Sequence, residues 1–220
     1  GFMPSVALID YELTLSLPKR ATADTGIDAL THAMEAYVSK KANAYSDTQA
    51  IEAMKLIGPN LRKVYHDGND LKAREKMMLG ATLAGIAFSN ASVALVHGMS
   101  RPIGAIYHVP HGLSNAMLLP AVTEYSIPSA TKRYADCAKA IGIALSDDAD
   151  DVANQKLLKE LIAINDELNV PSPSEFGIDK KDFMQNLEIM AEQAIASGSP
   201  ANNPRVPESK EIVEIYKLLW

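Results

Sequence analysis

The sequence contains very little cysteine: Cys137 is the only one among 220 residues. A single thiol cannot form a disulfide within the chain, and it cannot supply a cysteine-rich zinc site. The sequence also lacks an apolar run of membrane-spanning length, and its first residues do not show the basic-then-apolar profile of a signal peptide. These absences favour a chain that works in a reducing cytoplasm, without a membrane partner.

Basic residues are neither abundant nor clustered. The chain has 21 Lys and Arg against 27 Asp and Glu, a formal net charge of −6 and no block of Lys and Arg. A nucleic-acid-binding surface is therefore not expected. The composition is otherwise ordinary, with 47% hydrophobic and 22% charged residues, so a chain of this length can bury a sizeable core.

Extended structure is also scarce. The stretch "PSVALIDYELTLSLP" (4–18) is rich in apolar and β-branched residues and predicts a strand, with residues 5–17 extended. A lone strand leaves its backbone groups unpaired, so we expect it to pair with a sheet that these residues do not supply. We therefore assign residues 1–18 as a connecting strand and residues 19–220 as a helical domain.

After Pro18 the apolar residues recur with helical spacing, interrupted by short Gly, Pro and Asn breaks. This pattern predicts an all-α fold class, a single helical bundle of roughly seven to ten helices. The helices are expected at 24–39, 46–65, 71–89, 95–107, 111–126, 129–141, 149–168, 179–196 and 208–219.

The stretch "TGIDALTHAMEAYVS" (25–39) places an acid and an imidazole four residues apart on an otherwise apolar helix. Asp28 and His32 project from the same side of that helix, so both can contact one ion. An ordinary surface or capping pair has the same spacing, so the pair alone does not establish a metal site. Glu35 follows His32 by three residues, and we interpret it as part of a solvated helix face rather than a group that orients a ligand.

Further histidines are candidates for the missing ligands, although a buried histidine that only makes hydrogen bonds is the usual explanation for any one of them. In "ALVHGMSRPIGAIYHVPHGLSNAMLLP" (94–120), His97 lies in an apolar helix pattern and His111 follows Pro110 at a proline-started helical turn. A buried histidine needs a polar partner, and several in apolar settings would each need one. With Asp28 and His32 they make an Asp-His-His-His set, which suits Fe²⁺ or Zn²⁺ better than Mg²⁺ or Ca²⁺.

The motifs "TGIDALTHAMEAYVS", "GIAFSN", "LVHGMSRPIGA" and "VPHGLSNAMLLP" occur in this order, and the chain closes with "NNPRVPESKEIVEIYKLLW". Together they resemble the iron-dependent (group III) alcohol dehydrogenase family. The resemblance implies a helical C-terminal domain of the dehydroquinate synthase-like fold. It also implies an oxidoreductase that binds an alcohol or aldehyde oxygen on Fe²⁺, with Zn²⁺ as the alternative metal, and exchanges hydride with NAD(P). The implied metal ligands are Asp28, His32, His97 and His111.

Two departures from the family pattern matter. Many members have a second histidine four residues after the ligand, where this chain has Arg101, so a proton relay does not carry over from that position. His108 is the candidate substitute, although an exposed helix-end histidine explains it more simply.

The family also places a nucleotide-binding domain with a Gly-Gly-Gly-Ser loop before the helical domain, and these residues contain no such loop. We therefore expect the helical domain alone, inactive without its partner domain.

The resemblance assigns two further residues. Phe88 in "GIAFSN" is expected to line the substrate pocket, although a plain core position explains it equally well. Thr14 is expected on one wall of the cofactor cleft, and Arg101 either faces the cofactor's charge or is a surface arginine. The expected partners are a small alcohol or aldehyde, the nucleotide-binding domain of a longer parent protein, and a second copy in a homodimer.

Two other functions remain open from the sequence. Helical metal-dependent phosphohydrolases use a His…His-Asp…Asp pattern, and "YHDG" supplies His66 and Asp67. A histidine at the C-terminal end of a helix is also explained by its favourable interaction with the helix dipole. A non-catalytic helical assembly domain is the third interpretation.

Overall fold

The computed structural model describes residues 5–220 and contains ten α-helices in that range. The α-helices are α1 (Lys19–Val38), α2 (Ala44–His66), α3 (Leu71–Ala91), α4 (Leu95–Tyr107), α5 (His111–Ser126), α6 (Thr131–Ile141), α7 (Asp150–Glu167), α8 (Pro173–Phe176), α9 (Lys180–Ala196) and α10 (Ser209–Lys217). Three short 3-10 helices accompany them: η1 (Tyr11–Thr14), η2 (Ile127–Ser129) and η3 (Ser199–Asn202). The predicted all-α fold class is confirmed.

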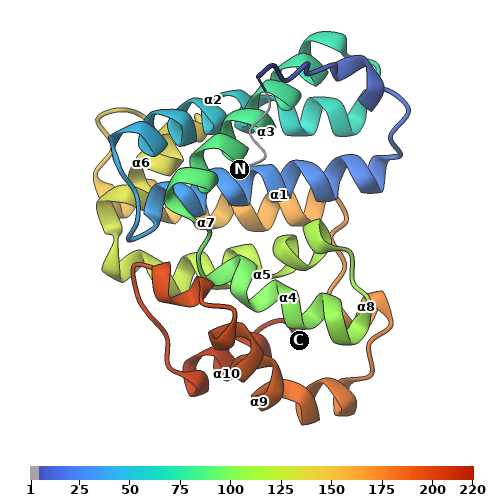
Figure 1. The fold of residues 1–220 in the computed structure, drawn as a ribbon, viewed down its shortest axis with the longest axis vertical. Helices are drawn as coiled ribbons and strands as arrows, with labels where there is room; N and C mark the ends of the chain where they lie inside the picture. The colour runs from blue at the N-terminus through green and yellow to red at the C-terminus, as the bar shows by residue number, and fades with distance from the viewer. Residues whose placement is uncertain (1–4) are drawn as a thin grey trace.

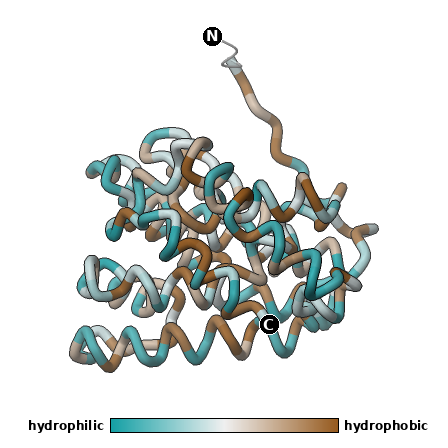
Figure 2. The backbone as a smooth tube through the Cα atoms, turned by 90° about the horizontal axis from the view of Figure 1, so that it is seen from below, coloured by the Kyte–Doolittle hydropathy of each residue, from teal (hydrophilic) through white to brown (hydrophobic). Residues whose placement is uncertain are grey.

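The predicted strand is wrong for the part of the segment that the structure describes. Residues 5–10 have no regular secondary structure, η1 follows them, and residues 1–4 lie outside the described range. Figure 2 shows this segment running away from the helical body. Leu8 is 94% exposed, and no strand among residues 5–220 offers backbone partners for a ladder. The segment has the apolar and β-branched composition of a strand, but residues 5–220 contain no neighbouring strand with which it could pair.

Helix boundaries follow local capping signals. α1 begins at Lys19, earlier than expected, because the extended Pro18 (φ −64°, ψ 156°) places its carbonyl to accept from the Thr22 amide at 2.9 Å. α2 begins with a capping box between Asn43 and Ser46. The short helix α8 was not expected; Ser172 caps it through a reciprocal bond with Glu175.

The helices form two groups that meet along α1 and α5 (Figure 1). α2 and α3 pack on α1, while α4 packs on α5, and α9 and α10 pack against each other. α6 and α7 pack together, α6 touching α2 and α7 touching α5. The junction of α1, α4 and α5 is therefore held from both sides.

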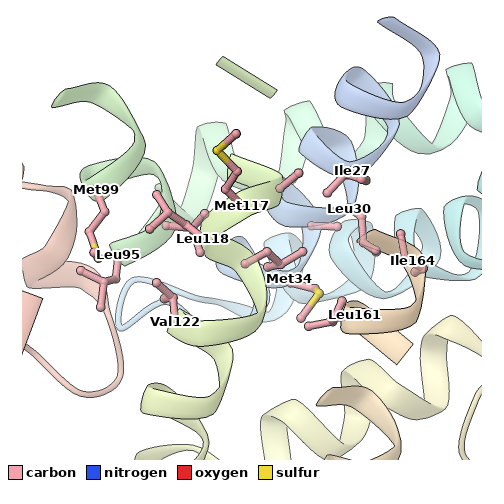
Figure 3. Packing of buried hydrophobic residues seen from close by; sticks show 14 of the residues in the cluster. Ile27, Leu30, Met34, Leu95, Met99, Met117, Leu118, Val122, Leu161 and Ile164 are labelled. Atoms are coloured by element: carbon pink, nitrogen blue, oxygen red, sulfur yellow. The ribbon is translucent and has the colours of Figure 1, made fainter. Parts of the chain in front are cut away.

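Apolar side chains fix that junction (Figure 3). Met34 on α1, Leu118 on α5 and Leu161 on α7 are each at most 1% exposed and belong to one continuous core. Burying a side chain of this size stabilises the fold by about 1.5–3 kcal/mol. The core thereby sets how α1 faces α5.

No single helix among residues 5–220 is long and apolar enough to cross a bilayer. Only α3 and α4 together have the necessary length and apolar composition, and the chain bends by 103° between them.

Candidate metal centre

Four side chains from three helices converge where α1, α4 and α5 meet. Asp28 and His32 come from α1, His97 from α4 and His111 from α5, and one donor atom from each lies within 4.8 Å of all the others. Asp28 Oδ1 is 3.4 Å from His97 Nε2, and 3.7 Å from both His111 Nε2 and His32 Nδ1. The structure thus brings together all four predicted ligands.

The helix carrying His111 approaches α1 closely because a glycine follows that histidine. A Cβ on Gly112 would lie 2.4 Å from the backbone oxygen of Asp24 on α1. No real side chain fits at that distance, so only glycine lets the first turn of α5 rest on α1. This contact sets the separation of His111 from Asp28.

Glu35 holds the helix that carries His97. Its side chain is buried, and Oε1 accepts from the Val96 amide at 2.6 Å while Oε2 accepts from the Ala94 amide at 3.0 Å. α4 has no side-chain cap of its own, so Glu35 satisfies amide donors at its start. Oε2 also lies 2.6 Å from His97 Nδ1. The interpretation of Glu35 as part of a solvated face is wrong, because the turn between α3 and α4 folds back over it.

The Glu35 contact fixes which imidazole nitrogen of His97 faces the cluster. A carboxylate only accepts, so His97 Nδ1 carries the hydrogen and donates it to Glu35. Nε2 then faces Asp28, and it is the nitrogen whose lone pair can bind an ion once its own proton has been displaced. A carboxylate behind a histidine in this way is a common arrangement around protein metal ions, where it orients the ring and raises its basicity.

Aromatic contacts hold the ring of His32. Phe88 on α3 stacks on it with ring centroids 4.4 Å apart and an angle of 23° between planes. His97 lies on His32 as well, with centroids 4.2 Å apart. Phe88 is half-buried and packs against the core, so it is both a core residue and a wall of the cluster.

The cluster is buried at the back and open at the front. The side chain of His97 is 4% exposed, whereas that of His111 is 52% exposed, and Asp28 and His32 are near 19% and 18%. His111 is thus the most exposed of the four side chains, and its side of the cluster is the most accessible to a small molecule.

Protonation follows from this burial. Burial lowers the pKa of His32 to about 4, helped by the charge of His97, and burial also lowers the pKa of His111. Burial alone would lower the pKa of His97 too, but its hydrogen bonds with Asp28 and Glu35 raise it to about 9. Burial opposes ionisation of Asp28, yet the hydrogen bond with His97 and the nearby imidazoles lower its pKa. At neutral pH two imidazoles offer lone pairs and His97 carries a proton that an ion would displace.

The donor set fits a divalent ion of borderline softness. Tetrahedral donors about 2.1 Å from a metal lie about 3.4 Å from one another, close to the separations of 3.4 to 3.7 Å around Asp28 Oδ1. Three imidazole nitrogens and one carboxylate oxygen suit Fe²⁺ or Zn²⁺ rather than Mg²⁺ or Ca²⁺.

The other residues singled out from the sequence lie outside this cluster. His108 is the exposed C-cap of α4 in the left-handed region (φ 56°), and Arg101 is exposed on α4. Thr14 donates to the Tyr11 carbonyl and lines a groove of about 270 Å³ with residues of α1 and α3. His66 pairs with Glu167 at 2.6 Å and is not part of the four-residue cluster.

Sequence reasoning missed Asn115. It lies on α5 one turn after His111, is fully buried, and its amide nitrogen contacts Asp28 at 2.6 Å. The signal was available, because residues four apart on a helix share a face and an amide in "LSNAMLLP" needs a buried partner.

Comparison with known proteins adds to this geometry. A family model described as "Fe-containing alcohol dehydrogenase family, C-terminal" matches residues 22–220. The 1,3-propanediol dehydrogenase of Citrobacter freundii is 39% identical over 98% of this chain and 55% of its own length. The NADPH-dependent butanol dehydrogenase of Clostridium saccharobutylicum is 36% identical over 99% of this chain and 55% of its own length. The chain thus spans about half the length of these relatives.

Solved structures agree with the fold. The crystal structure of a 1,3-propanediol oxidoreductase superposes with a TM-score of 0.93 at 36% identity, covering 99% of this chain and 56% of the other. The alcohol dehydrogenase from Oenococcus oeni gives a TM-score of 0.89 at 34% identity, over 96% of this chain and 54% of the other.

Proposed function

Because the chain belongs to the Fe-containing alcohol dehydrogenase family, we propose that it is the metal-binding half of an enzyme that interconverts small alcohols and aldehydes with NAD(P). The observation that carries the proposal is the convergence of Asp28, His32, His97 and His111. Their proposed role is to hold Fe²⁺, with Zn²⁺ as the alternative. When bound, such an ion polarises the substrate oxygen and stabilises negative charge on it.

The residues around the cluster do the positioning. Glu35 holds His97 in the tautomer that presents Nε2, and Phe88 keeps the ring of His32 from turning. Buried His97 excludes water from the back, so a substrate enters beside His111, where the cluster is open. Hydride transfer needs the reacting carbons held almost in contact, and this open side is where a nicotinamide has to face the substrate.

Further residues enter the proposal through the resemblance. Phe88 is proposed as a wall of the substrate pocket and Thr14 as part of the cofactor cleft. His108 is proposed to exchange the alcohol proton with solvent, since it is exposed and lies three residues before His111. Replacement by glutamine at His108 should then slow turnover without changing the metal content.

The cofactor half of the site is proposed to come from a preceding nucleotide-binding domain. This chain covers only about half of its relatives, and its residues lack a Gly-Gly-Gly-Ser loop. The apolar side chains of Val6 and Leu8 are 75% and 94% exposed and need a cover, which a sheet of that domain would supply. The 220 residues alone are therefore expected to bind metal and to show essentially no alcohol oxidation.

The first test is metal binding by the chain itself. Anaerobic titration should give one Fe²⁺ or Zn²⁺ per chain, and His97→Ala should abolish tight binding. His66→Ala is the matched control, because His66 pairs with Glu167 outside the cluster. Absence of tight binding by the unsubstituted chain would refute the proposed metal centre.

The second test is activity in a chimera. The portion of the Citrobacter freundii relative that precedes its matched region is fused before residue 5 of this chain. The fusion should oxidise NAD(P)H with small aldehydes, with 1,3-propanediol and 1-butanol as probes of the reverse direction. The fusion with His97→Ala should be inactive. A well-folded, metal-loaded fusion that turns over none of these probes would count against the dehydrogenase proposal.

A further inference from the structure

Asn115 occupies an unusual place for a neutral side chain. It is 0% exposed, and Nδ2 lies 2.6 Å from Asp28 Oδ1 and 3.2 Å from Nε2 of both His97 and His111. One amide nitrogen therefore touches three of the four candidate ligands. Its other polar atom, Oδ1, is buried without a hydrogen-bond partner among the described residues.

The chemistry of these contacts fixes which way the amide faces. Exchanging the two ends would put Oδ1 2.6 Å from a carboxylate oxygen, with two acceptors facing each other and no hydrogen between them. The nitrogen end therefore faces the cluster, as a hydrogen-bond donor. Leaving Oδ1 unpaired costs stability, roughly 1–3 kcal/mol for a buried polar atom, so this orientation is retained at the expense of the fold.

The three contacts differ in what an ion would do to them. A neutral imidazole nitrogen has a single lone pair, so His97 and His111 cannot accept from Asn115 once that lone pair points at a metal. A carboxylate oxygen has a second lone pair and can bind an ion and accept a hydrogen bond together. Only the contact with Asp28, the shortest of the three, is compatible with an ion in the cluster.

We propose that Asn115 is a positioning residue of the metal centre: its amide donates to Asp28 Oδ1 and holds that carboxylate toward the ion. This inference rests on the proposed metal site and adds a residue outside the four-ligand set. Asn115 would then support Asp28 as Glu35 supports His97: each is a hydrogen-bond partner that holds a candidate ligand in place from behind.

Three variants separate this role from general packing. Asn115→Leu keeps a side chain of similar size and removes the donor. Asn115→Asp keeps the shape and places a second acceptor against Asp28. Asn154→Leu is the matched control: Asn154 is 4% exposed, donates to the Thr131 carbonyl at 2.9 Å, and also has an Oδ1 without a partner among the described residues.

The test measures Zn²⁺ affinity by competition with a chromophoric chelator, and the visible spectrum of the Co²⁺-loaded chain as a readout of ligand geometry. Asn115→Leu should weaken Zn²⁺ binding by about 10–100-fold and change the Co²⁺ spectrum. Asn154→Leu should lower the thermal stability without either effect. Asn115→Asp should also weaken binding, and it decides the question if the leucine variant does not fold.

Two results would overturn the proposed role of Asn115. Unchanged Zn²⁺ affinity in a folded Asn115→Leu chain would overturn the proposal, as would tighter binding by Asn115→Asp, which would indicate an oxygen ligand instead of a donor. If the unsubstituted chain takes up no Zn²⁺, the proposed metal centre itself fails, whereas normal binding with insensitive Asn115 variants refutes only this inference.

Discussion

The carboxylate of Glu35 lies 2.6 Å from Nδ1 of His97 and at the same time accepts the backbone amides of Ala94 and Val96 at the start of α4. One side chain on α1 thus caps a second helix and orients an imidazole on it. Glu35 therefore both stabilises the start of α4 and orients a candidate metal ligand, so its substitution should affect stability and metal binding together.

Glu35→Gln should show that coupling. An amide has one acceptor atom where the carboxylate has two, so one of the α4 amides or His97 Nδ1 loses its partner. We expect a loss of about 1–3 kcal/mol in unfolding free energy and metal binding weaker by about 10–100-fold. Thermal unfolding and chelator competition measure the two effects. Glu52→Gln, with a side chain 53% exposed on α2, should change neither; a Glu35→Gln chain with normal metal affinity would contradict the role assigned.

The stability of the metal-free chain should depend on pH through His97. Its pKa is raised to about 9 in the folded chain from an ordinary value of 6.5. A base with a raised folded-state pKa contributes stability fully below about pH 6.5, and the contribution is lost as the pH rises through about 9. In the presence of EDTA, the stability advantage of the unsubstituted chain over His97→Gln should therefore shrink between pH 6.5 and 9.5. A difference that is constant across this window would contradict the assignment.

Metal affinity should move in the opposite direction with pH. The ion displaces the proton of His97, whereas the pKa values of His32 and His111 are lowered and these rings are already neutral. Release of one proton makes the apparent Kd for Zn²⁺ fall about tenfold per pH unit below the pKa of His97. Titrations between pH 6.5 and 8.5, in buffers of different ionisation enthalpy, report both the slope and the proton count. A slope of zero would mean that His97 binds the ion without losing a proton.

Gly112→Ala should separate α5 from α1. The added Cβ would meet the backbone oxygen of Asp24 at 2.4 Å, and a backbone atom cannot turn aside as a side chain can. We expect a loss of about 1–3 kcal/mol in stability, together with weaker metal binding because His111 moves away from Asp28. Gly85→Ala on α3 is the control, since its Cβ would meet no atom within 4 Å and should be neutral or stabilising. Equal behaviour of the two variants would refute the close approach of α5 to α1.

Most of the fold could be predicted because its helices are periodic and their ends carry local signals. All nine expected helices are present, and several start at capping residues such as Asn43, Asp70 and Asp179. The errors lie where local sequence is not decisive. Residues 5–10 have strand composition, but a strand is defined by its partner, and α8 is a single capped turn too short for a period to show.

The site could be predicted in part for a similar reason. Asp28 and His32 share a helix face by spacing alone, so their pairing needs no tertiary information. Their meeting with His97 and His111 depends on how α1 packs against α4 and α5, and there the family resemblance supplied the expectation. Glu35 was misread because its burial comes from the turn leading to Ala94, a contact across 59 residues that no helical pattern encodes.

The candidate ligands are also widely spaced along the chain, and this bears on when an ion can be acquired. His97 and His111 stand 65 and 79 residues after His32, as 97 − 32 and 111 − 32 give. In a newly made chain only Asp28 and His32 are neighbours, and two ligands hold an ion loosely. Bringing these residues together costs loop-closure entropy. We expect the packing of α1 on α5 to offset that cost, rather than the binding of an ion. Loading is therefore expected to follow folding, and a chain that folds without the ion keeps a site that can still be filled later.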